Sequence, residues 1–252
     1  MSMSVRDRLM RVGYLADVVW SRLHADRIVL LRPLVLMRAP VQGPVSNGTR
    51  SDRKPSSGSD AMQSWTTRWV NSEDDAFESL CRVTHYRPPP DQPTFGFAAV
   101  RSGTDHEAEV IGGLWISVHQ FRENDGSMVF KLPNRFAWLH SARVHPDHRR
   151  MGVYRGMMHR MWNEMSDRSE LRNVRQIGWT VHRLNQRSVA AHAEFARDTD
   201  PFFFWRIGPY GGLRADSDAI SLPARSRMPI QVDAGRWARP PKDCQDRPKT
   251  QT

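Results

Sequence analysis

The chain has 252 residues, 39% of them hydrophobic, and a formal net charge of +10. That length allows one sizeable domain with extensions, or two small domains. Two cysteines, Cys81 and Cys244, are too few for a disulfide framework or a cysteine-rich metal site, and they indicate a reducing compartment. Half of the positive excess lies in residues 1–63, so solvated basic ends are favoured over a nucleic-acid-binding domain.

Residues 1–63 are predicted to be an N-terminal extension, partly helical, with a disordered linker. The pattern favours an amphipathic helix over 5–23, and the apolar run 28–37 is too short and too interrupted to span a bilayer. Glycine, proline, serine and charged residues dominate 39–60, which is linker composition. Met62 precedes the first clear strand, and we hypothesise that it is the true start, which N-terminal sequencing of the native product would test.

A domain is predicted over residues 64–214, in the order strand, helix, three strands, helix, strand, helix, strand. The predicted strands are 65–70, 94–101, 109–120, 135–145, 175–181 and 202–207, and the predicted helices follow Asn71 or span 152–166 and 188–196. Residues 121–134 are predicted to be a loop, and 215–252 a disordered basic tail. This order of elements indicates a mixed α/β sheet.

A basic turn at residues 144–153 joins a predicted strand to a predicted helix. Pro146 ends the strand, Arg149 and Arg150 supply positive charge, and Gly152 lets the backbone approach a ligand closely. A strand, a short basic turn and a helix together present backbone N–H groups and guanidinium groups to a phosphate. The sequence therefore predicts an anion-binding turn, with a solvated basic turn as the alternative.

This turn resembles the acyl-CoA turn of the GNAT acyltransferase superfamily, which reads Arg or Gln, two residues, Gly, one residue, then Gly or Ala. Arg149 and Gly152 match the first two positions, whereas Tyr154 stands where a small residue is usual. The resemblance covers about residues 64–210. It implies an α/β fold with a mixed, mostly antiparallel central sheet flanked by helices.

The resemblance also implies acetyl-CoA as the acyl donor. Its pyrophosphate would bind the N–H groups at the start of the helix, the helix dipole and the arginines. Backbone groups of the preceding strand would pair with the pantetheine arm and polarise the thioester carbonyl. The cofactor-binding residues predicted here are Ala142, Arg143, Val144, Arg149, Arg150, Met151, Gly152, Val153 and Tyr154.

A second motif, at residues 185–192, resembles the family's later segment around the sulfur end of the cofactor. Asn185 and Ser188 match that segment and are predicted to contact the cofactor, while His192 stands where tyrosine is frequent. A histidine there would protonate the departing thiolate. The alternative interpretation is that Asn185 or Ser188 only caps a helix, and that His192 packs on its face.

An amine must lose a proton before it attacks a thioester, so a general base is expected. His140 is the first candidate, because it lies four residues before Val144, a spacing similar to that of a base histidine in some arylalkylamine members. His119 and Glu123 are the alternatives, and a packed histidine without a catalytic role is the competing interpretation. The other histidines are too scattered to form a metal site with His140, and no metal is predicted.

The sequence thus predicts a cytoplasmic N-acyltransferase that moves acetyl from acetyl-CoA directly to a primary amine, without a covalent acyl-enzyme. The amine acceptor and the acyl-chain preference are not legible. The rival is a nucleic-acid- or protein-binding module on the same fold with a degraded acyl-CoA site, or a nucleobase-modifying transferase. Tyr154, His192 and the replacement of the family's Gly-Phe ending by Ala196-Arg197 support it. A monomer or homodimer with no membrane partner is expected.

Overall fold

The computed structural model describes residues 29–41, 65–102, 108–123, 128–207, 210–215, 218–220 and 230–234. The predicted helix over 5–23, most of the predicted linker, Met62 and Cys244 lie outside these residues. The chain divides into two compact units, each described here by itself. The central unit comprises Pro40–Phe121 and Leu132–Ile177, and the terminal unit comprises Met1–Ala39, Arg122–Lys131 and Gly178–Thr252.

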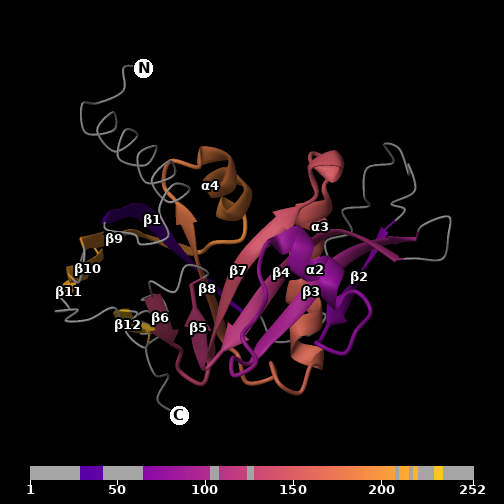
Figure 1. Cartoon of the computed structure of the whole chain (residues 1–252), viewed down its shortest axis with the longest axis horizontal. Coiled ribbons are helices and arrows are strands. Elements are labelled where there is room, and N and C mark those ends of the chain that lie inside the picture. Colours follow the sequence, from indigo (N-terminus) through magenta and orange to yellow (C-terminus); the bar gives the residue numbers. More distant parts are fainter. Residues whose placement is uncertain are drawn as a thin grey trace, which may run out of the picture. The chain divides into compact units, whose positions relative to one another are not determined.

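The central unit is built on four antiparallel strands in the spatial order β7-β4-β3-β2 (Figure 1). These strands are β2 (Trp65–Val70), β3 (Thr94–Ser102), β4 (Ala108–Val118) and β7 (Phe136–Val144). Residues 110–118 of β4 are all buried, which fits a strand covered on both faces. The predicted hairpin of β3 and β4 and the predicted strands β2 and β7 are confirmed.

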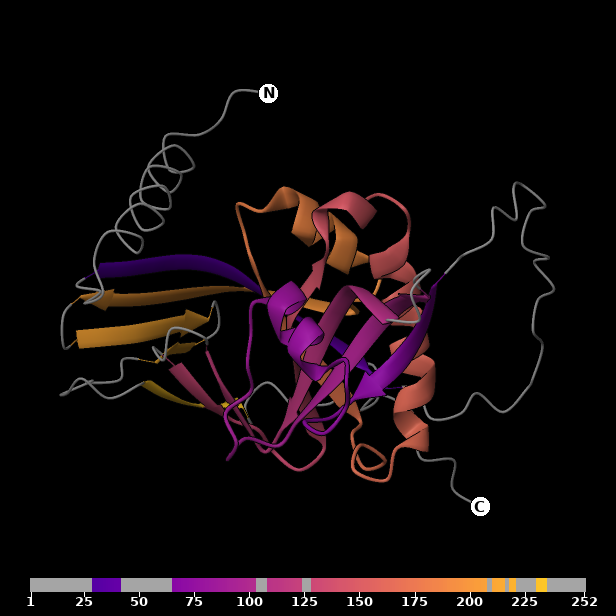
Figure 2. The same cartoon turned by 45° about the vertical axis from the view of Figure 1, so that its right-hand side comes forward.

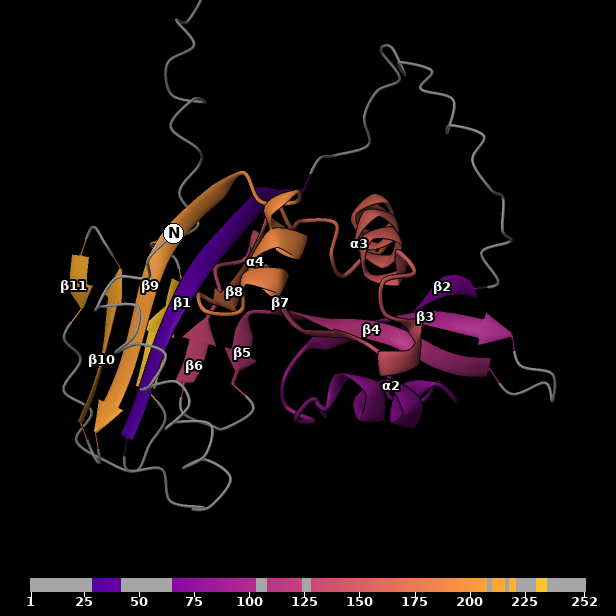
Figure 3. The same cartoon turned by 90° about the horizontal axis from the view of Figure 1, so that it is seen from above.

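Two helices cover opposite faces of this sheet, α2 (Phe77–Thr84) and α3 (Val153–Glu164), as Figure 3 shows. Neighbouring glycines of β4 make room for both, because consecutive strand residues point to opposite faces. A Cβ atom added to Gly113 would lie 2.0 Å from Leu80 Cδ1 of α2, and one added to Gly112 would lie 3.3 Å from Val153 Cγ1 of α3. The helices therefore approach the sheet at side-chain-free positions. Two short 3-10 helices, η1 (Pro146–His148) and η2 (Met165–Asp167), flank α3.

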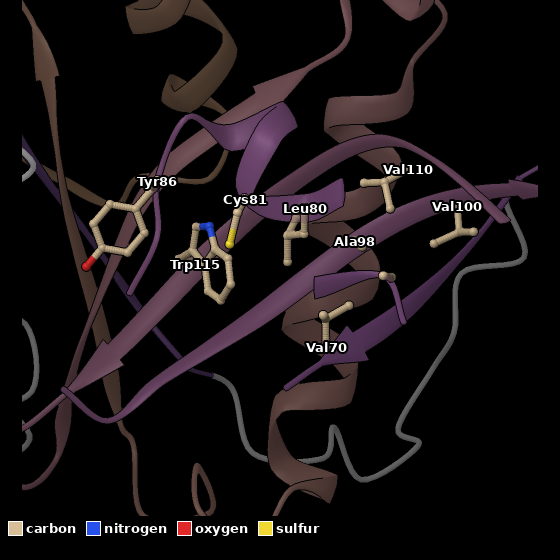
Figure 4. Packing of buried hydrophobic residues seen from close by; sticks show 9 residues of the cluster. Val70, Leu80, Cys81, Tyr86, Ala98, Val100, Val110 and Trp115 are labelled. Carbon is tan, nitrogen blue, oxygen red and sulfur yellow. The ribbon is translucent and has the colours of Figure 1, made fainter. Parts of the chain in front are cut away.

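The helix α2 begins later than Asn71, where the sequence predicted its cap. Its first residue is Phe77, because Asn71 Oδ1 accepts from Glu73 N at 3.0 Å and Asp74 Oδ1 from Ala76 N at 2.9 Å, which forms two local turns first. Its buried side joins a core cluster shown in Figure 4. That cluster comprises Val70, Ala76, Leu80, Cys81, Tyr86, Ala98, Val100, Val110 and Trp115.

On the other face of the sheet, methionines make the core. The predicted apolar face of α3 is confirmed, with Val153, Met157, Met158 and Met161 buried, followed by Met165 in η2. The long unbranched methionine side chain fills irregular space, which suits a helix that packs on a twisted sheet.

Strand β7 carries one extra residue opposite β4. Trp115 pairs with His140, whereas Gly113 pairs with Arg143, so two steps along β4 match three along β7. Ser141, inside this bulge, has a left-handed φ of 52°. A bulge of this kind redirects the side chains beside it.

The terminal unit contains an extended antiparallel ribbon that the sequence analysis did not predict (Figure 2). Strand β1 (Val29–Pro40) pairs with β9 (Asp198–Ile207), β10 (Tyr210–Ala215) pairs with β9, and β11 (Asp218–Ile220) pairs with β10. The apolar run near residue 30 is therefore a strand, and residues beyond 214 include regular structure. The tail prediction is corrected over residues 218–220, because β11 pairs with β10, the strand just before it in the chain.

Two further strands lie in the segment predicted as a loop over 121–134. Strand β5 (Gln120–Arg122) begins it, and β6 (Met128–Lys131) pairs in parallel with β12 (Ile230–Asp233). The remaining elements are β8 (Gln176–His182) and α4 (Gln186–Ala193), which lie close to their predicted positions in the chain. Within the described residues, no helix combines the length and apolar character needed to cross a membrane.

Candidate functional site

The basic turn of the central unit leads from the end of β7 into the start of α3. Its backbone takes two left-handed steps, at Arg150 (φ 66°) and Gly152 (φ 75°), before the helix begins at Val153. The helical hydrogen bonding starts with Gly156 N donating to Gly152 O at 2.9 Å. The amides of residues 153–155 form the first turn of the helix before that bond and point toward its N-terminal end.

Gly152 is required by backbone conformation and not by crowding. A Cβ atom added there would meet no atom within 4 Å, yet the left-handed φ disfavours any side chain. Open space above a helix start is where a phosphate binds. Tyr154, the second residue of the helix, is half-buried, and Met151 is 63% exposed.

Positive charge surrounds this helix start. Arg143, Arg149, Arg150 and Arg155 are all exposed. Arg149 Nε donates to Val144 O at 3.2 Å, which ties its side chain across the turn. The first turn of α3 contains no acidic residue, so the helix dipole and the arginines have the same sign there. Asp147, in η1 of the same turn, contributes a negative charge and lies 3.6 Å from His145 Nδ1.

Backbone pairing with β4 at the end of β7 joins the turn to the sheet. Val144 pairs with Gly112, and His145 N donates to Ile111 O at 2.8 Å. Ala142, in the bulge, falls between the paired residues His140 and Arg143. The predicted residues 142–144 and 149–154 are thus brought together on one continuous strand, turn and helix.

His140 lies in the interior of the central unit, 8% exposed. Burial lowers its pKa to about 3, so the imidazole is neutral near pH 7. Its Nε2 is 2.9 Å from Ser117 Oγ and its Nδ1 is 3.3 Å from Ser141 Oγ. The aromatic rings of Tyr86 and Phe121 lie 4.6 and 4.2 Å from it, between centroids.

A buried polar network continues from His140 to the loop before β3. Gln92 Nε2 donates to Ser117 Oγ at 2.9 Å, and Thr94 Oγ1 is 3.0 Å from Ser117 Oγ. The same Gln92 nitrogen lies 2.9 Å from Tyr86 Oη and 3.0 Å from Thr94 Oγ1. An amide nitrogen has two N–H groups, so the three hydroxyl oxygens share them.

The sequence pattern of the family described as the acetyltransferase (GNAT) family matches residues 60–196, more than half of the chain. The chain belongs to the GNAT family. The predicted resemblance and the predicted fold class, a mixed and mostly antiparallel sheet flanked by helices, are confirmed.

Three solved structures are similar to this GNAT chain at low identity. A tandem GNAT protein from the clavulanic acid biosynthesis pathway is 11% identical over 69% of this chain and 53% of its own, with a TM-score of 0.41. A GCN5-related N-acetyltransferase from Kribbella flavida is 11% identical over 66% and 54%, with a TM-score of 0.35. A Drosophila protein is 15% identical over 85% and 58%, with a TM-score of 0.38. The chain spans a little over half the length of these structures. Among curated proteins, no match is found.

The second predicted motif, at residues 185–192, lies in the terminal unit and forms the start of α4. Asn185 caps that helix, with its Oδ1 accepting from Ser188 N at 3.2 Å. His192 Nδ1 is 2.7 Å from Ser188 O, and since a carbonyl oxygen only accepts, this nitrogen carries the proton. Burial lowers the pKa of His192, and its ring lies 6.0 Å from that of Trp179, between centroids. In the neutral ring Nε2 is then an acceptor, which supports the packing interpretation over proton donation.

The other candidate bases differ from His140 in burial. His119 is exposed, with a left-handed φ of 64°, and Glu123 is half-buried beyond β5. Within the described residues, no three histidine, cysteine, aspartate or glutamate side chains are grouped as a metal ion would need.

The sequence analysis missed Gln92, Ser117 and Ser141. One signal was available, because Ser117 interrupts an otherwise apolar run and is fully buried. A buried hydroxyl in an apolar strand needs a partner. That partner is His140 on the neighbouring strand β7, and sequence spacing alone does not identify it.

Proposed function

We propose that the protein is an acyl-CoA-dependent N-acyltransferase that transfers an acyl group, most simply acetyl, directly to a primary amine. The observation that carries the proposal is the left-handed Gly152 at the start of α3, with open space above it and exposed arginines beside it. A helix N-terminus and guanidinium groups suit the pyrophosphate of coenzyme A.

In this proposal each part of the turn has a separate role. Arg149 and Arg150 bind phosphate oxygens, the first amides of α3 bind the pyrophosphate, and the backbone of Ala142 to Val144 pairs with the pantetheine arm. Hydrogen bonds from that backbone would polarise the thioester carbonyl. The contacts of Asn185 and Ser188 with the cofactor and the role of His192 stay predictions from the family resemblance.

The amine is proposed to attack the thioester within a ternary complex. No acyl-enzyme is required, because the amine itself is the nucleophile once it is deprotonated. The two cysteines fit a reducing, cytoplasmic setting.

The first test is the melting temperature of the full chain with and without acetyl-CoA. A ligand at about a hundred times its Kd stabilises a protein by about 2.7 kcal/mol, which raises the melting temperature by several degrees. Arg149→Glu and Gly152→Asp should lose that rise, because the first reverses a binding charge and the second puts a carboxylate at the helix start. Arg82→Glu, an exposed arginine of α2, is the matched control and should keep the rise.

The second test is thiol release from acetyl-CoA across a panel of primary amines. Release that depends on one class of amine would establish both the reaction and the acceptor class. No thermal shift at millimolar acetyl-CoA would contradict the proposal. Steeply salt-dependent binding of duplex DNA or RNA without such a shift would favour the rival binding module.

A further inference from the structure

In the proposed reaction an amine must lose a proton. His140 is not suited to be the general base that takes up and keeps this proton. A general base works best when its pKa lies near the working pH. Burial is the cause of the lowered pKa of His140, and no charged group contributes to it. Among the described neighbours of the ring, Tyr86 is the titratable side chain that faces it. The imidazole is therefore placed to pass a proton along and not to store one.

A continuous path of proton-carrying atoms runs through His140. It goes from Ser141 Oγ to His140 Nδ1 (3.3 Å), through the ring to Nε2, and on to Ser117 Oγ (2.9 Å). From there it continues to Thr94 Oγ1 (3.0 Å). Ser141 and Thr94 are half-buried, whereas His140 and Ser117 are buried. The two residues at the ends of the path are thus partly exposed, and the two between them are buried.

The near end of the path is held by an unusual backbone conformation. Ser141 has a left-handed φ in the middle of a strand, which costs about 1 kcal/mol or more in a residue with a side chain. Adjacent strand residues normally point to opposite faces, so the bulge is what brings Ser141 Oγ to the ring of its neighbour His140. The strain therefore serves to place a hydroxyl beside the segment 142–144 that would hold the thioester.

The middle of the path is held by packing and by Gln92. The rings of Tyr86 and Phe121 fix the plane of the imidazole. Gln92 Nε2 donates to Ser117 Oγ, so the hydroxyl proton of that serine is left to point at His140 or Thr94. Both directions lie on the path, which is what a relay requires.

We propose that Ser141, His140, Ser117 and Thr94 form a proton relay for the acyltransfer reaction, with Ser141 as the residue that meets the amine. This inference rests on the proposed function. As the ammonium N–H bond breaks, its proton goes to Ser141 Oγ while the Ser141 proton goes to His140 Nδ1. The His140 Nε2 proton goes to Ser117 Oγ, the Ser117 proton to Thr94 Oγ1, and the Thr94 proton to water.

The freed electron pair of the amine then attacks the thioester carbon. Each relay group ends with its original number of protons, so no charge stays in the buried segment. The reverse transfer, from water through Thr94 to Ser141, protonates the departing thiolate and returns His140 to its first tautomer. The second amine proton leaves to water as the amide forms, so one proton is released overall.

The test compares Ser117→Ala, Thr94→Val and Thr94→Ser in the full chain, with acetyl-CoA and the best alkylamine of the panel. Ser117→Ala and Thr94→Val break the path, so kcat should fall about tenfold or more at pH 7. The kcat of these variants should rise with pH toward the wild-type value as the pH approaches the pKa of the amine, because only pre-existing free amine reacts. Thr94→Ser keeps the hydroxyl and should restore the wild-type pH profile.

A second acceptor separates relay loss from general damage. A fluorinated ethylamine that is already neutral at the assay pH needs no deprotonation, so the deficit of Ser117→Ala should disappear with it. The KM for acetyl-CoA should not change in either case. The control is Thr66→Val, which removes an exposed hydroxyl on β2 outside the network.

Nitrogen-15 NMR of the His140 ring supplies a readout that does not depend on turnover. The relay requires a neutral ring between pH 5 and 8, and a change in the proton's preference between the two nitrogens in Ser117→Ala. A ring that titrates near pH 7, or a wild-type pH profile in Ser117→Ala, would overturn the relay while leaving acyl transfer intact. Absence of thiol release by the wild type with every amine would overturn the proposed function, and the relay with it.

Discussion

The basic turn at residues 144–153 and the buried network around His140 are both polar parts of the central unit, in opposite settings. The turn is exposed, and its features come from consecutive residues: a left-handed glycine, arginines and a helix start. The network is assembled from three segments of the chain that meet only through β3, β4 and β7. The turn is therefore suited to ligand affinity, and the network to proton movement and stability. Charge variants of the turn should therefore change ligand binding and leave stability nearly unchanged, and variants of the network should do the reverse.

The largest expected effect concerns acid stability and the network. The folded protein binds the His140 proton only near pH 3, whereas the unfolded chain binds it near 6.5. Between these values the unfolded state holds more protons, so the free energy of unfolding falls as pH falls, by about 1.4 kcal/mol per unit. His140→Gln should reduce this slope between pH 6 and 4, measured by urea denaturation at several pH values.

His182 and His192 have lowered pKa values from burial and act in the same direction, so part of the slope should persist. The control is His159→Gln, on the exposed side of α3, which should keep the wild-type slope. Equal slopes in His140→Gln and the wild type would show that His140 is not held neutral by the fold.

The next effect tests whether Gln92 stabilises the network without affecting the turn. Gln92→Leu removes the amide that donates to buried hydroxyls, and should lower the free energy of unfolding by about 2 kcal/mol. The thermal shift with acetyl-CoA should stay the same size, because the turn is untouched. Gln186→Leu makes the same chemical change at an exposed position and should be nearly neutral. If Gln92→Leu abolished the rise in melting temperature with acetyl-CoA, the turn and the network would not be independent of each other.

The smallest effect isolates the backbone of the turn. Gly152→Ala adds a methyl group that meets no atom within 4 Å, so any cost comes from the left-handed φ, about 1 kcal/mol. Gly152→Asn should cost less, because asparagine tolerates this conformation better. Chemical denaturation of the two variants beside the wild type would measure both values. A cost well above that of a single strained residue would mean that the glycine has a further role in the fold.

Structural features that depend on residues close together in the chain were predicted from the sequence. The hairpin, the methionine face of α3 and the turn each depend on a few consecutive residues, and the predicted family and fold class are confirmed. The strands β1 and β12 were not predicted, because each pairs with a segment about a hundred residues or more away in the chain. The strands β10 and β11 pair with the strands directly before them, and the sequence analysis missed them because it took the region beyond 214 as a tail.

The two histidines show the same division. From the sequence, His140 was the first candidate for the general base and His192 a candidate for protonating the thiolate, each with a packing alternative. Tertiary structure differentiates them, because the bulge and β4 place hydroxyls at both nitrogens of His140, whereas His192 donates to the backbone of its own helix. Sequence spacing determined the basic turn that is proposed to bind phosphate, since its chemistry lies in neighbouring residues. Only the pairing of strands decided which buried groups share a proton, since hydrogen bonds depend on distances between residues far apart in the chain.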